Sequence, residues 1–325
     1  MTTQRVRAIA FVFTTIITMT LFVSARAAKY AGDPFSLGVG ARSLALGGAT
    51  IAGPFDGTAA WWNPAGMEAL HGRQISAMHA ETFGSLLNHD FVGYVDSRDR
   101  VGLVKAYGFY FYYLGGGGIR ITAMDQYNRP YVVREESHGD YVLAASIGLK
   151  PAVKWTVGIS AKILYRDLGT ETGKGLTLDA GVLFNPRDNV TLGIMATDVS
   201  SGFIRYSGKT FGGGAHTESI YPTLKPAFSI IKKHKDLSGQ FSASGDLKFE
   251  NLRGTAQYWS GSLSLDSHYG LEISWRGILF ARGGFDVGRL TAGGGFDYRH
   301  VAIDFAWMHQ DAFDETFRVS ASYRF

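Results

Sequence analysis

The feature that most constrains this chain is a two-residue alternation of apolar and polar side chains that recurs along most of its length. In the segment 154–166 one phase reads Trp, Val, Ile, Ala, Ile, Tyr, and the other reads Lys, Thr, Gly, Ser, Lys, Leu, Arg. Side chains of a β-strand point alternately to opposite faces, so each such segment predicts a strand with one apolar and one polar face. The same alternation is found in 141–149, 176–184, 190–196, 241–249, 269–275, 290–298 and 301–307.

The connections between the predicted strands alternate between short and long. An up-and-down barrel in an outer membrane has this asymmetry, with short periplasmic turns and longer external loops. A soluble β-sandwich would explain the alternation of side chains but not the alternation of connection lengths. The sequence therefore predicts an all-β, transmembrane, antiparallel barrel of about 14 strands over residues 73–325. The predicted strands are 73–83, 88–97, 100–113, 139–150, 153–166, 174–185, 189–199, 222–234, 238–250, 263–274, 278–286, 290–299, 301–309 and 315–325. The largest loops are 114–138, 200–221 and 251–262.

Composition agrees with a barrel. The chain has 42 glycines and 44 aromatic residues (22 Phe, 16 Tyr and 6 Trp) against 8 prolines, and 18% of its residues are charged. This mixture suits many strands with tight turns and aromatic faces. The chain has no cysteine, which excludes a disulfide framework and a cysteine-based metal site.

The amino terminus predicts export. Arg5 and Arg7 precede an apolar run over 8–23, and Ala25-Arg26-Ala27 supplies small residues for a cleavage site, which is the pattern of a signal peptide over residues 1–27. The run is shorter than the roughly 20 residues that a spanning helix needs. Cleavage would leave 29 basic against 28 acidic side chains. Such a balance gives no reason to expect a nucleic-acid partner.

The last predicted strand ends the chain on an aromatic residue. Tyr323 and Phe325 belong to its apolar phase and alternate with Ser322 and Arg324. This ending resembles the terminal signal that outer-membrane barrels present to the barrel-assembly machinery. Aromatic residues near the ends of other apolar phases favour contact with outer-membrane lipid at the headgroup level. We therefore expect the chain in a Gram-negative-type outer membrane.

If the apolar phases face lipid, the polar phases line the lumen. Charges of both signs close together indicate internal ion pairs, and the alternative is a polar path for a ligand. The luminal side chains singled out on this basis are Asp179, Glu272, Arg282, Asp297, Asp304 and Arg318.

The stretch 38–67 does not alternate. It is apolar and glycine-rich, and within 28–72 we expect it to fold as a plug inside the lumen, the alternative being an ordered lead-in to the first strand. Arg42, its single cation, is expected to dock on a luminal carboxylate. The other plug residues of interest are Asp56, Trp61 and Trp62, which offer aromatic area, and Asn63, Pro64 and Gly66, which predict a rigid turn.

Stretches that resemble catalytic or nucleotide-binding motifs do not have the residue spacing that those motifs require. Ser207-Gly208-Lys209-Thr210 ends like a phosphate-binding loop, but Phe203 stands where its first glycine is required. The chain has no G-x-S-x-G elbow and no histidine pair at i, i+4. We therefore predict no catalytic residues, no metal and no cofactor. A barrel enzyme using His309, Asp311 and Asp314 in an outer loop is the remaining enzymatic alternative, and the glycine run 115–118 is expected to be a flexible outer loop.

A resemblance to a known family rests on two places. The order Gly40-Ala41-Arg42, Gly47-Gly48-Ala49, Asp56 and Trp62-Asn63-Pro64-Ala65-Gly66 resembles the amino-terminal pattern of the PorV/PorQ outer-membrane proteins, a branch related to the FadL-type fatty-acid transporters. The strands that close on Ser322-Tyr323-Arg324-Phe325 are similar to the end of that family.

The resemblance implies a fourteen-stranded barrel with its amino-terminal segment in the lumen. For PorV-like relatives it implies help in type IX secretion or surface presentation of proteins, with secreted cargo as partner. For FadL-like relatives it implies uptake of hydrophobic small molecules such as fatty acids or aromatics. The secretion role is the first expectation from the sequence, and the hydrophobic channel is the alternative.

Overall fold

A computed structural model describes residues 33–82, 86–98, 102–169, 171–200, 202–208, 215–250, 252, 255–309 and 315–325. The predicted signal peptide, 1–27, lies outside these residues. The first seven wall strands are β1 (Gly72–Thr82), β2 (Leu87–Ser97), β3 (Val104–Met124), β4 (Pro130–Ala152), β5 (Trp155–Asp167), β6 (Glu171–Arg187) and β7 (Val190–Thr197). The other seven are β10 (Thr223–His234), β11 (Leu237–Lys248), β13 (Leu263–Trp275), β14 (Leu279–Asp286), β15 (Arg289–Tyr298), β16 (Val301–Met308) and β17 (Thr316–Arg324).

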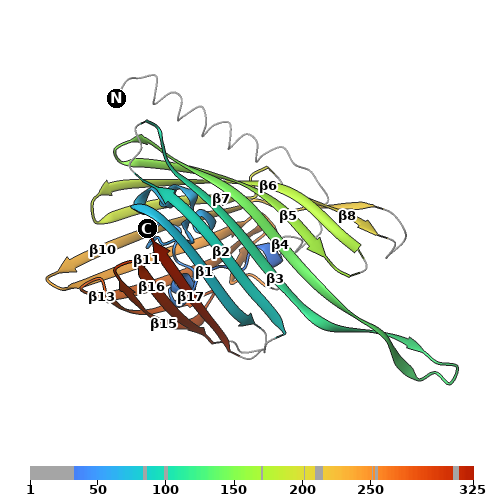
Figure 1. The fold of residues 1–325 in the computed structure, drawn as a ribbon. Coiled ribbons are helices and arrows are strands. Elements are labelled where there is room, and N and C mark those ends of the chain that lie inside the picture. The colour runs from blue at the N-terminus through green and yellow to red at the C-terminus, as the bar shows by residue number, and fades with distance from the viewer. Residues whose placement is uncertain are drawn as a thin grey trace.

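The strands form one closed antiparallel barrel (Figure 1). The sheet has 17 strands, and without the three short strands β8 (Phe203–Gly208), β9 (His216–Ser219) and β12 (Tyr258–Ser260) the remaining fourteen make the ring. β1 pairs with both β2 and β17, and β7 pairs with β10, so the wall has no open edge. Closure satisfies the backbone groups that hydrocarbon would leave unpaired. The predicted fold class is confirmed.

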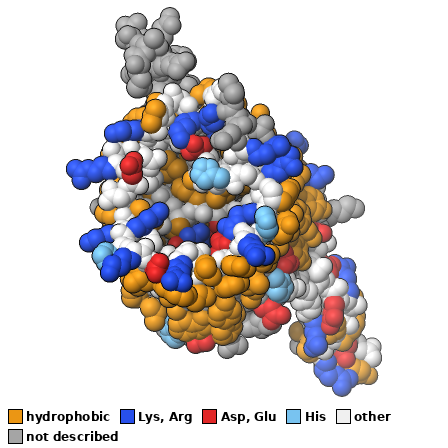
Figure 2. Space-filling view, turned by 60° about the vertical axis from the view of Figure 1, so that its left-hand side comes forward, with side chains coloured by type: hydrophobic (Ala, Val, Ile, Leu, Met, Phe, Trp, Pro, Cys, Tyr) orange, Lys and Arg blue, Asp and Glu red, His pale blue; other side chains and the backbone are white. Residues whose placement is uncertain are grey.

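Alternation along each strand separates the outer wall from the lumen. Leu271 and Ile273 of β13 are each 48% exposed, whereas Glu272 between them is 5% exposed. Figure 2 shows the resulting apolar wall below a rim of charged side chains. The apolar phase therefore faces outward, which is the phase that meets lipid in an outer-membrane barrel.

The prediction of a long loop over residues 114–138 is wrong. Residues 114–138 are not a loop, because β3 runs on to Met124 and β4 begins at Pro130, so that they form a two-stranded ribbon beyond the barrel (Figure 1, lower right). The turn is closed by Asp125, whose N–H donates to the carbonyl oxygen of Arg129, and by Asn128 at a φ of 60°. The glycine run 115–118 lies inside β3, since backbone pairing with β4 orders it regardless of side chains.

The other two long connections also contain strands. β8 and β9 lie within 200–221 and extend the sheet from β6, and β12 lies within 251–262 and pairs with β13. These short pieces lack enough residues for an alternation to be read from sequence.

Residues 33–71, here called the luminal segment, fold inside the barrel (Figure 1, blue helices). They form η1 (Asp33–Phe35), α2 (Ala41–Ala45), α3 (Ala59–Trp62) and η2 (Pro64–Ala69), four short helices joined by turns. α2 packs on β14 to β17 and η2 packs on β2 to β6, so the segment bridges opposite walls. No helix in the described part of the chain is both long and apolar enough to cross a membrane.

Glycines of the wall make room for the luminal segment. A side-chain carbon at Gly270 would lie 2.6 Å from the carbonyl oxygen of Leu46, and one at Gly158 would overlap the backbone of Pro64 and Ala65. Both glycines are in the inward phase of their strands. The wall therefore approaches the segment backbone to backbone at these points.

Candidate functional site

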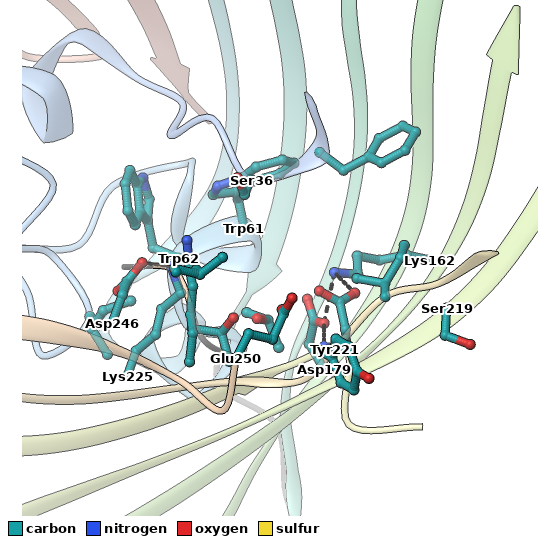
Figure 3. A pocket seen from close by; sticks show the side chains of 18 of the residues that line it. Ser36, Trp61, Trp62, Lys162, Asp179, Ser219, Tyr221, Lys225, Asp246 and Glu250 are labelled. Atoms are coloured by element: carbon teal, nitrogen blue, oxygen red, sulfur yellow. Dashed lines mark hydrogen bonds and ion pairs between the residues drawn. The ribbon is translucent and has the colours of Figure 1, made fainter. Parts of the chain in front are cut away.

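The luminal segment has a cavity on each side. The outer cavity, of about 120 Å³, lies toward the long loops and is lined by residues of the luminal segment, the wall and the loops (Figure 3). The second cavity, here called the vestibule, has a volume of about 540 Å³ and lies toward the short turns, beside Arg42. The segment thus separates two spaces within one barrel.

Aromatic rings form one part of the outer cavity. Trp61 stacks on Tyr112 with ring centroids 4.9 Å apart, and it meets Tyr110 edge-on at 5.5 Å. Phe35 and Trp62 also line the space. Such rings offer flat apolar surface at little conformational cost, which suits a planar apolar ligand.

Ion pairs form the rest of the outer cavity. The Lys162 ammonium lies 2.7 Å from Asp179 and 2.9 Å from Asp198, and the Lys225 ammonium lies 2.6 Å from Asp246. Figure 3 shows the first group on the right and the second on the left. Each of these charges has an opposite charge beside it, and the two carboxylates next to Lys162 share one cation.

Arg42 connects the luminal segment to the wall. Its Nε and Nη2 donate to the two carboxylate oxygens of Glu272 at 2.8 and 2.7 Å, which is a bidentate pair. Arg282 donates to the same carboxylate at 2.6 Å and to Asp304 at 2.6 Å. The structure thus brings together four of the sequence-predicted residues, one from the segment and three from the wall.

The environment of Arg42 keeps it charged. Burial by itself lowers the pKa of the guanidinium, but the charge and hydrogen bonds of Glu272 outweigh burial and raise that pKa above its ordinary value. The Arg42 guanidinium therefore stays protonated in the folded barrel.

The Asn63-Pro64-Gly66 turn is rigid for partly different reasons than the sequence suggests. Asn63 is extended, with a φ of −161°, and its side-chain oxygen accepts from the N–H of Ala65 at 3.1 Å, which caps η2 behind Pro64. Gly66 is not at a positive φ; a side chain there would collide with the ring of Phe55 instead. Close packing, not backbone freedom, requires this glycine.

Asp56 and Trp62 organise the luminal segment itself. Asp56 accepts hydrogen bonds from the N–H and hydroxyl of Thr58 at 2.8 and 2.6 Å, just before α3. The indole N–H of Trp62 donates to the carbonyl oxygen of Val39 at 2.9 Å. Asp56 makes no ion pair with a wall residue among those that the structure describes.

Two further luminal residues lie apart from the Arg42 network. Arg318 is buried and donates from Nη1 to the carbonyl oxygen of Gly38, a second connection between wall and segment. Asp297 lies near the short turns and pairs with Arg324.

The terminal residues face outward. Tyr323 and Phe325 are 48% and 55% exposed, and the backbone of Phe325 pairs with that of Arg73 at the closing seam between β17 and β1. Their recognition by the assembly machinery stays a prediction.

Several cavity residues were not singled out from the sequence. Lys225 lies in β10 among apolar residues. The only feature of the sequence that places its side chain in the lumen is that it shares a phase with Ala227 and Ser229. Ile220 and Leu252 come from long connections, where no periodicity identifies them. Among the described residues no group of three or more His, Asp or Glu could hold a metal ion, and Asp311 and Asp314 lie outside those residues.

Comparison with known proteins was made at the level of sequence and of structure. No family model matches the chain, and no curated protein matches it. The crystal structure of the Pseudomonas putida toluene transporter TodX is similar over 89% of this chain and 99% of TodX, at 12% identity and a TM-score of 0.56. The monoaromatic hydrocarbon channel CymD is similar over 89% of this chain and 98% of CymD, at 13% identity and a TM-score of 0.56.

The fold is that of these two hydrocarbon channels. These solved relatives are transport channels rather than enzymes, and they support an outer-membrane barrel. The PorV/PorQ branch and the cleavage after residue 27 stay predictions.

Proposed function

We propose that this chain is an outer-membrane channel through which small apolar molecules, aromatic compounds among them, diffuse into the cell. The sequence offers this function as the alternative, and the transport of toluene by TodX and of monoaromatic hydrocarbons by CymD favours it over protein secretion.

The outer cavity carries this proposal. An apolar cavity of roughly 150 Å³ in another protein is large enough for benzene, and the outer cavity, at about 120 Å³, is of similar size. Trp61 and Tyr110 supply ring faces at its wall. A single aromatic ring therefore fits the space by size and by chemistry.

The two cavities suggest a route. A molecule entering from the long-loop end would meet the outer cavity first, whose aromatic side is formed largely by the luminal segment itself. The vestibule lies beyond the segment, so passage along the lumen requires the segment to shift. The Arg42–Glu272 pair is one of the contacts that resists such a shift.

Narrowing the outer cavity tests the proposal. Leu252 is buried and lines the cavity, so Leu252→Trp should fill it and slow uptake of benzene by cells whose outer leaflet is lipopolysaccharide. Leu86→Trp is the matched control, since Leu86 is 68% exposed on another loop. Equal uptake by both variants, at equal barrel amounts, would refute the channel.

Help in protein secretion or surface presentation is the second candidate function. The observation that favours it is the β3–β4 ribbon, which projects beyond the barrel with apolar side chains exposed on it, among them Met124, Tyr127 and Tyr131. Exposed strands of this kind can pair with an extended segment of another protein.

Replacing residues 117–137 with a tight turn separates the two functions. Under the secretion function, a secreted protein that copurifies with the wild-type barrel would be lost from this variant. Under the channel function, benzene uptake would be unchanged and no such protein would copurify with either barrel.

A further inference from the structure

The short-turn end of the barrel is strongly basic. Figure 2 views the molecule toward this end and shows Lys and Arg side chains around a central hollow. Five exposed cations at this rim have no carboxylate within ion-pair distance among the described residues. They are Lys154, Arg187, Lys233, Lys235 and Arg299.

The carboxylates at this rim do not neutralise those cations. Four of them are already held by other basic side chains, and Asp188, next to Arg187, makes no ion pair among the described residues. The pairs are Glu68 with Lys150, Asp96 with Arg98, Asp236 with Arg276 and Asp297 with Arg324. A surplus of positive charge therefore remains at one end of the barrel, although basic and acidic residues are nearly balanced over the whole chain.

Part of this charge surrounds an opening. Lys233, Lys235 and Arg276 line the vestibule of about 540 Å³, whose floor includes Arg42 and Glu272. The volume is within the range of ligand pockets and admits several side chains of a bound peptide. The lining also includes the carboxylates of Asp236 and Glu272, which are paired with Arg276 and Arg42, so Lys233 and Lys235 give the vestibule a net positive charge that attracts an acidic ligand.

The position of these cations disfavours lipid as the occupant. Lys233 lies on β10 in the same phase as Ser229, which hydrogen-bonds across the lumen side to Gln240 and Ser242, so it points away from the hydrocarbon. Phospholipid headgroups reach the outward phase instead, where Lys232 lies.

The spacing of the cations disfavours a small anion. Lys154 belongs to the β4–β5 hairpin, Arg187 to β6–β7, Lys233 to β10–β11 and Arg299 to β15–β16. These hairpins are distributed around the ring, so one small ion reaches at most neighbouring cations. A chain segment with several carboxylates can contact many of these cations at once.

We propose that the short-turn mouth is a docking site for an acidic segment of a periplasmic protein, part of which enters the vestibule. Outer-membrane barrels have their short turns on the periplasmic side, which gives such a partner access. This inference concerns a partner and does not depend on what the lumen transports.

A decaglutamate peptide with a fluorescent label tests the proposal on the full barrel in nanodiscs of phosphatidylcholine, a lipid without net charge. We expect the peptide to bind, with affinity falling as NaCl rises from about 50 to about 500 mM. The mouth variant Arg187→Gln, Lys233→Gln, Arg299→Gln should weaken binding about tenfold. The control variant Lys174→Gln, Arg205→Gln, Lys232→Gln removes equal charge from other exposed positions and should bind like the wild type.

Four results would overturn the proposal. They are absence of peptide binding, equal weakening by the two variants, displacement of the peptide by an equal concentration of tripolyphosphate, and, in parallel nanodiscs that also contain phosphatidylglycerol, enrichment of that lipid around the barrel in place of peptide binding. A photo-reactive group on the peptide adds a positional readout. Cross-links within 231–240 or 274–280 support the vestibule, and cross-links on the long-loop end refute it.

Discussion

Arg42 donates two hydrogen bonds to the carboxylate of Glu272, and this pair joins the luminal segment to β13. The same carboxylate accepts a hydrogen bond from Arg282. One buried acid is therefore shared between a part of the chain that lies in the lumen and the wall that surrounds it.

Removing the shared acid should destabilise the barrel more than removing Arg42. Glu272→Gln leaves both arginines without that carboxylate and should cost about 3 kcal/mol, whereas Arg42→Gln leaves Glu272 paired with Arg282 and should cost less. Urea midpoints of the refolded barrel measure both. Glu135→Gln breaks an exposed pair on the ribbon and should cost under about 1 kcal/mol; a reversed order would contradict the assignment.

Deleting residues 38–67 should raise ion conductance in planar bilayers. The deletion removes most of the material that separates the outer cavity from the vestibule, so a continuous aqueous path should open. A barrel lacking ribbon residues 117–137 serves as the deletion control. Conductance equal to wild type after the luminal deletion would show that the segment does not close the lumen.

The glycine contacts between wall and segment should be sensitive to size. Gly158→Val places carbon atoms where the backbone of Pro64 and Ala65 lies and should displace the luminal segment, whereas Gly239→Val meets open space. Since the chain has no native cysteine, a single Ser43→Cys reports the change. We expect faster maleimide labelling of that thiol only in the Gly158 variant, and equal rates would rule out the predicted displacement.

Trp61→Ala should destabilise the barrel by about 3 kcal/mol, because it removes a ring stacked on Tyr112 and in contact with Tyr110. Trp259→Ala is the control, since that side chain is 48% exposed on β12. Thermal midpoints in detergent compare the two. A midpoint for Trp61→Ala no lower than that of the control would argue against a packing role.

Trypsin added to intact cells should cleave the ribbon and spare the short turns. Arg129 lies at the ribbon tip with an exposed side chain, at the end that we assign to the exterior. Lys235 lies in a short turn at the opposite end and should be protected until the outer membrane is permeabilised. Fragment masses identify the cut sites, and early cleavage after Lys235 would invert the orientation.

The barrel wall could be predicted from local sequence patterns. The predicted strands match the fourteen that close the barrel, because a period of two depends only on neighbouring residues and on which phase meets lipid. The alternation also placed Glu272, Arg282 and Asp304 in the lumen. It failed at the ribbon, where Gly115 and its neighbours have no apolar phase and only pairing with β4 makes them a strand.

Which luminal charges meet, and what lies between them, depends on how distant parts of the chain pack together. The sequence suggested that Arg42 would find a carboxylate, but the choice of Glu272 depends on the register of β13 against β14 and on how the luminal segment crosses the barrel. The role of Gly66 likewise follows from the nearby Phe55 ring. The two cavities and the basic mouth arise from closure, which brings together residues that no local pattern connects.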